Sequence, residues 1–234
     1  MPMCARPVHD PRSETGSQTA HTENKGITMS QPRHLHRNGA SICFATHEAR
    51  PEALPDALTR YLRPERRTRR TLEIERQGAA LAAQAFTVDA DVVAFIKAVC
   101  WWGGFSGIGG RVIKRNEATV IRSRLIAAKA AVEQEIPDLQ TAIRAVRAIN
   151  SLGLSFASKH LRMLWPQHCP VLDSQIHKQL GYALNSTGYC AFAGDCRAVA
   201  DFLIEQAIPN PARDGQPVWY VADVEAAVFV LVGN

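Results

Sequence analysis

Apolar residues recur every three or four positions along most of the chain from residue 52 onward. This spacing is typical of amphipathic helices, whose core-facing side chains repeat about every 3.6 residues. The last such segment is apolar on nearly every face, so we expect it to lie inside the fold. No segment alternates convincingly as a strand does, so the sequence predicts an all-α helical domain of one or two lobes. The predicted helices cover residues 52–61, 79–86, 89–102, 117–133, 138–148, 155–165, 173–181, 189–206 and 218–230.

Residues 1–40 differ in composition from the rest of the chain. They are rich in Pro, Ser, Thr, His, Asn and Gly and hold almost no large apolar side chains. Such a segment cannot bury enough surface to offset the entropy lost on ordering. We therefore expect residues 1–40 to be a disordered tail and residues 41–234 to form the helical domain. Met29 is a candidate start of translation, and His34 and His36 are read as inert rather than as a metal tract.

Residues 150–181 carry most of the candidate chemistry. The tight connection Ser151-Leu152-Gly153 joins the predicted helices 138–148 and 155–165, so a helical hairpin is expected at residues 150–155. We expect Gly153 to be the residue that allows a positive φ there. Free backbone N–H groups of such a hairpin can bind an anion, and a DNA phosphate is one candidate.

The chain then returns to the second helix of the hairpin. Pro166 ends that helix, and residues 167–172 are expected to be extended because Pro170 restricts its neighbour. Asp173 follows at the start of the next predicted helix, where a carboxylate is a good N-cap. The return is therefore expected to bring one carboxylate beside the helix that carries Lys159.

This stretch resembles the helix-hairpin-helix DNA glycosylases, and among them the short archaeal-type 8-oxoguanine DNA glycosylases. The likeness is close over about thirty residues and weaker from Asp91 to the C-terminus. Two positions depart from the family pattern, since Ser151 replaces the first hairpin glycine and Ser155 replaces the catalytic lysine. Lys159 lies one helical turn after Ser155. The matching residues are Gly153, Ala157, Ser158, Leu161, Arg162, Val171, Leu172 and Asp173.

The resemblance implies a glycosylase that extrudes a damaged or modified purine and cleaves its bond to C1′. Asp173 is then the carboxylate that stabilises the oxocarbenium-like state, although it could instead be a plain helix cap. Lys159 is the candidate for a Schiff base with C1′, but it could equally contact a phosphate or pair with Asp173. Ser155 could hold a water for direct hydrolysis. Leu152, Gly153 and Arg162 are the expected DNA contacts on the hairpin and its second helix.

Residues 101–110 hold five glycines and three aromatic residues, so a flexible loop is expected there. Aromatic rings in such a loop can stack on an extruded base. Trp101 is expected in the core, and Trp102 or Phe105 is expected to face a substrate pocket. A buried tryptophan pair that caps a core helix is the alternative. Arg111 and Lys114, just beyond the loop, are candidate DNA contacts.

The chain has a formal net charge of +5, from 27 basic and 22 acidic residues. This mild excess permits a polyanionic partner without requiring one. Five arginines in residues 63–70 could bind phosphates or could form a solvated face. Asp223 and Glu225, the charges of the last predicted helix, are expected to pair with arginines rather than to take part in catalysis.

The six cysteines form no CxxC pair, and the spacing of the histidines fits no ligand set, so neither a metal nor another cofactor is expected. No apolar run reaches membrane length and no signal peptide is evident, so we expect a cytoplasmic, nucleoid-associated monomer. Its expected partner is double-stranded DNA with a modified base. Two other functions stay open, a non-catalytic helix-hairpin-helix DNA-binding module and a helical partner-binding protein without DNA affinity.

Overall fold

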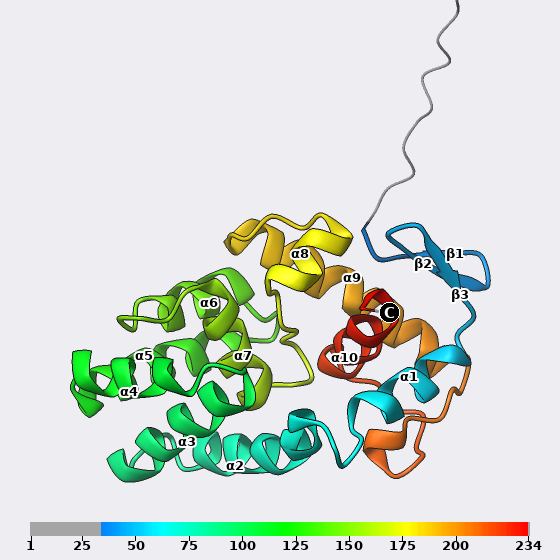
Figure 1. Cartoon of the computed structure of the whole chain (residues 1–234). Helices are drawn as coiled ribbons and strands as arrows, with labels where there is room; N and C mark the ends of the chain where they lie inside the picture. The colour runs from blue at the N-terminus through cyan, green and yellow to red at the C-terminus, as the bar shows by residue number, and fades with distance from the viewer. Residues whose placement is uncertain (1–33, 234) are drawn as a thin grey trace, which may run out of the picture. The chain divides into compact units, whose positions relative to one another are not determined.

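A computed structural model describes residues 34–233 of the chain, with the side chain of Arg67 left out of the description. This part is mostly helical, which confirms the predicted class, and it also holds a small sheet (Figure 1). Its α-helices are α1 (Ala53–Tyr61), α2 (Thr71–Ala83), α3 (Asp89–Trp102), α4 (Ser106–Arg115), α5 (Ala118–Val132), α6 (Leu139–Arg147), α7 (Leu154–Leu164), α8 (Ser174–Leu180), α9 (Ser186–Glu205) and α10 (Val221–Val232).

Two short 3-10 helices connect these elements, η1 (Arg67–Arg70) before α2 and η2 (Pro211–Arg213) before α10. Most of the predicted helices are confirmed within a few residues of their ends. The predicted cap of α8 is also present, since Asp173 accepts from the first turn and Gly181 ends the helix at φ +80°. Among the described residues, no helix has both the length and the apolar character needed to cross a bilayer.

The expectation of no strands is wrong. An antiparallel sheet pairs β1 (His36–Asn38) with β2 (Ser41–Phe44) and β2 with β3 (His47–Ala49). Ile42 and Phe44 point from β2 into the core, but strands of three or four residues are too short to show a clear alternation. Residues 34–40 therefore belong to the folded part and not to a disordered tail. The remainder of the predicted tail, with Met29, lies outside the described residues.

The glycine-rich segment after α3 is also different from the expectation. It forms α4, where a loop was expected, and α4 packs against α3. Glycine lowers helix propensity, but burial of Val112 and a close approach of Gly109 to Cys100 favour the helix. Likewise α2 begins at Thr71, eight residues before the predicted start, because it packs along α7.

The helices gather in two groups (Figure 1). Helices α2 to α7 lie on one side, with α5 against α6 and α6 against α7. The last helix, α10, packs on α1 and α9 on the other side. It is buried along most of its length, as its apolar sequence predicts. The return from α7 to α8 runs between the two groups, and this is where the candidate site lies.

Candidate active site

The turn between α6 and α7 is held by hydrogen bonds from the end of α4. Asn116 Oδ1 accepts from the backbone N–H of Asn150, and the Asn116 amide donates to the Asn150 carbonyl. Arg115 donates to Ser151 Oγ over 3.2 Å. The hairpin is therefore anchored to a helix with a basic last turn, a relationship that the sequence did not reveal.

The positive φ in this turn belongs to Ser151 and not, as expected, to Gly153. Ser151 has φ +76°, a region in which a non-glycine residue is strained by roughly 1–3 kcal/mol. Gly153 has φ −73° and is the N-cap of α7. The left-handed position of this turn is therefore Ser151, two residues before Gly153.

Lys159 lies inside the site and points toward the start of α7. Its Nζ lies 2.9 Å from Ser155 Oγ and 3.3 Å from Asp173 Oδ2. Lysine side chains on a helix lean toward its N-terminus, which is why a lysine one turn later reaches Ser155. Only 7% of Lys159 is exposed, and its Nζ also lies 5.4 Å from the Phe156 ring centre. The structure thus brings together Ser155, Lys159 and Asp173.

Asp173 uses its two carboxylate oxygens for different contacts. Oδ1 accepts from the backbone N–H groups of Gln175 and Ile176, while Oδ2 faces Lys159. The preceding residue is also fixed, since the Leu172 N–H donates to Ser158 Oγ over 3.1 Å. Cap and ion pair are therefore roles that one carboxylate fills at once, and its position is rigidly determined.

The end of α3 forms one wall beside Lys159. A β-carbon on Gly103 would lie 2.9 Å from Lys159 Cδ and 2.9 Å from the Phe156 ring. Phe105, 66% exposed, meets Phe156 edge to face at 6.3 Å. Sequence reasoning missed both Gly103 and Phe156, because only the fold brings α3 against α7.

The expectation for the tryptophan pair is reversed. Trp101 is 40% exposed, and the Arg70 guanidinium lies 5.4 Å from the centre of its ring. Trp102 is buried and donates from Nε1 to Thr71 Oγ1. The helical phase of α3 turns Trp102 inward with Val99, so Trp102 supports the core and only Phe105 and Trp101 are exposed aromatic groups here.

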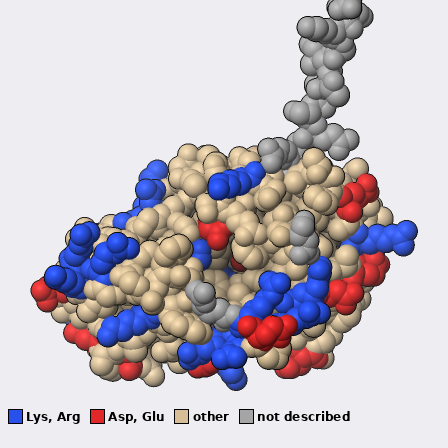
Figure 2. Space-filling view, in the orientation of Figure 1, with Lys and Arg blue, Asp and Glu red and all other residues tan. Residues whose placement is uncertain are grey.

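Figure 2 shows a hollow in this face of the molecule, between the α2–α7 side and the α1–α10 side. Lysine and arginine side chains lie on both sides of it, with acidic groups among them. Arg111 and Lys114 are exposed on α4, as a role in binding DNA requires. Leu152 is buried and its N–H donates to Ile149, so an anion at the hairpin would have to use the first-turn N–H groups of α7 instead.

Arg162 is buried, so the expectation that it contacts DNA from the surface of α7 is wrong. It is 1% exposed, and its Nη1 donates to Glu75 Oε1 over 2.7 Å. Its Nε lies 3.7 Å from Glu225 Oε2. The residue shares the polar spacing of Ser155 and Lys159, but α2 and α10 cover that end of α7. The prediction that Asp223 and Glu225 pair with arginines is confirmed, since Asp223 pairs with Arg213 at 2.8 Å.

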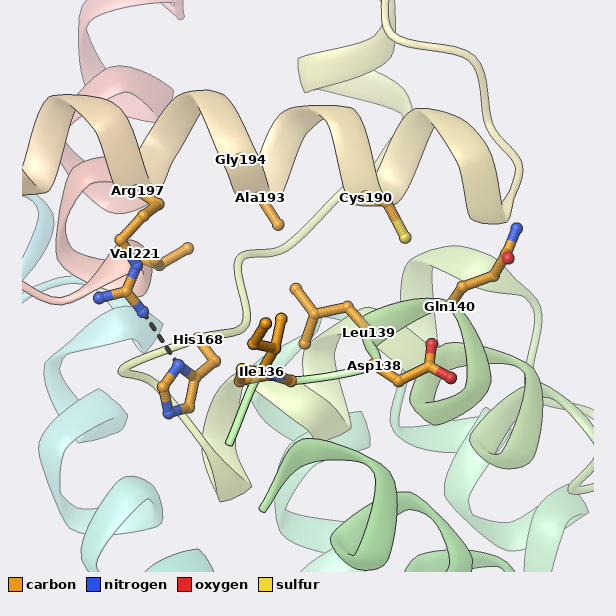
Figure 3. A pocket seen from close by; sticks show the side chains of 11 residues that line it. Ile136, Asp138, Leu139, Gln140, His168, Cys190, Ala193, Gly194, Arg197 and Val221 are labelled. Atoms are coloured by element: carbon orange, nitrogen blue, oxygen red, sulfur yellow. Dashed lines mark hydrogen bonds between the residues drawn. The ribbon is translucent and has the colours of Figure 1, made fainter. Parts of the chain in front are cut away.

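A separate groove lies along α9 (Figure 3). It encloses about 570 Å³, and its walls are mostly apolar, with Leu139 and Ile136 facing Ala193. At one end Arg197 donates to His168 Nδ1 over 2.9 Å. Burial and then the charge of Arg197 lower the pKa of His168. The groove shares no lining residue with the Lys159–Asp173 site.

Histidine chemistry contributes little here. Burial lowers the pKa of His160 to about 4, so its ring is neutral at pH 7 and packs against Phe95. Among residues 34–233, no three His, Cys, Asp or Glu side chains are arranged to hold a metal ion.

Comparisons of the chain with protein-family models, with curated proteins and with solved structures found no match.

Proposed function

We propose that this protein is a DNA glycosylase of the helix-hairpin-helix type that excises a damaged or modified purine such as 8-oxoguanine. The observation that carries the proposal is the Lys159–Asp173 pair, 3.3 Å apart and largely screened from water. In this reading α6, the turn at residues 148–153 and α7 are the DNA-binding hairpin. An amine and a carboxylate held together beside such a hairpin supply the nucleophile and the anion that base excision needs.

The surroundings of the pair also favour a DNA substrate. The first N–H groups of α7 have no partner within the helix, and a phosphate can bind such groups. Arg111 and Lys114 on α4 can contact the same backbone. Phe105 packs against Phe156 beside Lys159 and offers an exposed ring, and Trp101 offers a second one at the end of α3. Each base stacked on such a ring gains about 1–3 kcal/mol.

In the proposed reaction, extrusion brings C1′ of the target nucleotide to Nζ of Lys159. The neutral amine bonds to C1′ while the bond from C1′ to the base breaks. The base leaves with that electron pair and takes up a proton, and the amine nitrogen releases one, so protons balance. Asp173 stabilises the positive charge that develops on the sugar. Opening of the sugar ring gives a Schiff base, from which elimination of the 3′ phosphate cuts the strand.

Direct hydrolysis is the variant of this mechanism in which Lys159 stays an ion-pair partner. Ser155 would then hold a water, with Asp173 orienting it toward C1′. The geometry supports the amine route more, because Ser155 Oγ is already engaged by Lys159 Nζ at 2.9 Å.

Borohydride trapping on duplexes with single lesions, 8-oxoguanine first, tests the proposal. We expect a covalent adduct that Lys159→Gln abolishes and that Ser155→Ala and the control Lys129→Gln retain. Lys129 is a suitable control because it pairs with Glu133, just after the end of α5, and not with a residue of the candidate site. Base release without an adduct would show hydrolysis, and no base release across a broad lesion panel would reject the glycosylase proposal.

The second candidate is a DNA-binding module without catalysis. Two observations favour it: Ser155 stands at the family's lysine position, and Lys159 is fully engaged by Ser155 and Asp173. Such a module would bind plain duplex with a strong salt dependence and would bind equally well as Asp173→Asn. A protein without affinity for duplex DNA at low salt would exclude both candidates.

A further inference from the structure

Five ion pairs connect the candidate site to the interior of the fold. Lys159 pairs with Asp173, while Arg162 and Arg213 lie between carboxylates from two other elements, α2 and α10. We call the residues of these five pairs the inner charge cluster. Its members are Lys159, Arg162, Arg213, Asp173, Glu75, Asp223 and Glu225.

The inner charge cluster has three cationic side chains and four carboxyl groups, so one carboxyl is in excess. Glu75 is bound by both arginines, at 2.7 and 3.2 Å. Asp223 is bound by Arg213 and by Asn210. Glu225 has the weakest pairing, at 3.7 Å from Arg162 Nε.

One carboxyl oxygen of Glu225 also lacks a hydrogen bond. Its Oε2 is buried without a partner in the described structure, and so is Arg162 Nε. A buried ionised carboxylate with an unsatisfied oxygen is costly, whereas the neutral acid is tolerated. Burial raises the pKa of Glu225 to about 8, against the opposing effect of Arg162, and Asp173 raises it further. At neutral pH the excess proton of the cluster therefore belongs on Glu225.

Glu225 is linked to the candidate site in two ways. A backbone hydrogen bond from Val171, two residues before Asp173, reaches its carboxyl group. Its charge also acts on both Asp173 and Lys159. A change in the charge of Glu225 therefore changes the electrostatic potential at the Lys159–Asp173 pair, which the proposed reaction uses.

We propose that Glu225 is a positioning residue that keeps the excess proton of the inner charge cluster and so sets the charge balance of the Lys159–Asp173 pair. With Glu225 neutral, three cations face three anions, and Asp173 is the carboxylate that balances the charge of Lys159. Lys159 has to give up a proton before it attacks C1′, and a second negative charge on ionised Glu225 stabilises the ammonium form and so makes that step harder. The catalytic meaning rests on the proposed function, but the coupling itself does not.

Groups from several elements act on Glu225 and belong to this titration. They are Arg162 and Lys159 on α7, Asp173 on the return, Tyr61 on α1 and Cys196 on α9. Asp223 on α10, Glu75 on α2 and Arg213 on η2 are linked to Glu225 through Arg162 and the ion pairs of the cluster.

Carbon-13 NMR of the full chain tests the coupling without any DNA. We expect the Glu225 carboxyl resonance to titrate with a midpoint about 3–4 pH units above the ordinary value of about 4.3. The Lys159 Cε resonance, assigned by its loss in Lys159→Arg, should show a step at the same pH. In Glu225→Gln this step should vanish, and in Glu205→Gln, a change of an exposed glutamate on α9, it should persist.

Glu225→Gln mimics the neutral acid, so the variant is expected to fold. If that variant does not fold, the titration of Glu225 and Lys159 in the wild type still tests the coupling. A Glu225 midpoint below about pH 5, or a Lys159 resonance that ignores the titration of Glu225, would overturn the inference.

Catalytic assays then separate the inference from the proposed function. If an adduct forms, the single-turnover trapping rate should fall by at least tenfold between pH 7 and 9.5 in the wild type, and Glu225→Gln should remove most of that fall. A coupled NMR titration in a protein that forms no adduct and releases no base would reject the glycosylase proposal and leave the charge coupling intact. An adduct whose pH profile is unchanged by Glu225→Gln would support the glycosylase proposal and reject the effect of Glu225 on the reaction.

Discussion

Gly103 lies against the aliphatic stem of Lys159, at the point where a β-carbon would come within 2.9 Å of Cδ. The backbone there is helical, at φ −69°, so the requirement for glycine is one of space and not of conformation. This contact joins α3 to α7 and helps to direct Nζ toward Ser155 and Asp173. It makes Gly103 as much a part of the candidate site as the charged residues.

Gly103→Ala is therefore expected to displace Lys159. We expect the trapping rate to fall about 10- to 100-fold, since small misplacements of a reacting group have effects of this size. Stability should fall by about 1–3 kcal/mol because of overpacking. Denaturant unfolding and single-turnover trapping measure the two effects.

Gly194→Ala is the matched control, since Gly194 lies within α9 with open space around it. Alanine there should stabilise the protein by roughly 0.5–1 kcal/mol and leave trapping unchanged. Full activity of Gly103→Ala would mean that Lys159 tolerates displacement or has no catalytic role.

Asp173→Asn should distinguish the role of Asp173 as a helix cap from the role of its negative charge. Asparagine can still accept from the first turn of α8, but it leaves the largely buried Lys159 without its counter-charge, so we expect stability to fall by about 1–3 kcal/mol. Base release should fall by about 10²–10³-fold, because the developing sugar cation loses its counter-charge. Asp138→Asn, which changes the equivalent cap of α6, should lower stability by no more than about 1 kcal/mol and leave base release unchanged. Equal activity of the two variants would contradict the assigned role of Asp173.

Arg162→Met should be among the most destabilising changes in the chain. It leaves Glu225 without its arginine and removes one of the two partners of Glu75. Breaking a buried pair in this way costs about 3–5 kcal/mol. Arg111→Met, at an exposed position of α4, should stay within about 0.5 kcal/mol of the wild type. Urea unfolding at pH 7 compares them, and similar midpoints would contradict the structural role of Arg162.

The raised pKa of Glu225 predicts a dependence of stability on pH. Between about pH 4.5 and 8 the unfolded chain ionises this carboxyl while the folded chain keeps it protonated. The unfolded state therefore binds fewer protons, and the contribution of Glu225 to the unfolding free energy decreases as pH rises through this window. The decrease should amount to a few kcal/mol, and Glu225→Gln should remove it from the curve of unfolding free energy against pH. Parallel curves for the two proteins would show that Glu225 has an ordinary pKa.

Removal of two basic side chains of α4 should change how salt affects DNA binding. If Arg111 and Lys114 each neutralise a phosphate, their double change to glutamine should reduce the slope of log K against log salt by about 1.8. The double change of Arg37 on β1 and Arg50, which follows β3, to glutamine is a control of equal charge. Fluorescence anisotropy on a plain duplex measures the slopes. Equal slopes for the two double variants would remove α4 from the binding surface.

The local parts of this protein could be read from its sequence because they depend on neighbouring residues. The period of the apolar positions predicts α3 and α6 almost to the residue, and Asp173 was recognised as a cap from its place after an extended segment. The approach of Lys159 to Asp173 was also foreseeable, since a short return after Pro166 leaves the chain few other paths. An apolar α10 had to be buried, and its two acids had to find arginines, because a buried charge without a partner is costly.

Tertiary packing decided the features that are set by residues far apart in the chain. Burial of Val112 against α3 makes a helix of a glycine-rich segment, and closure by α2 and α10 turns Arg162 from a surface cation into an interior one. The rotation of α3 against its neighbours fixes which of Trp101 and Trp102 is exposed. The excess carboxyl on Glu225 exists only because five elements bring their charges to one place. No local pattern could predict the excess of one carboxyl over the cations. Each of these residues resembles an ordinary surface charge until tertiary packing removes it from water.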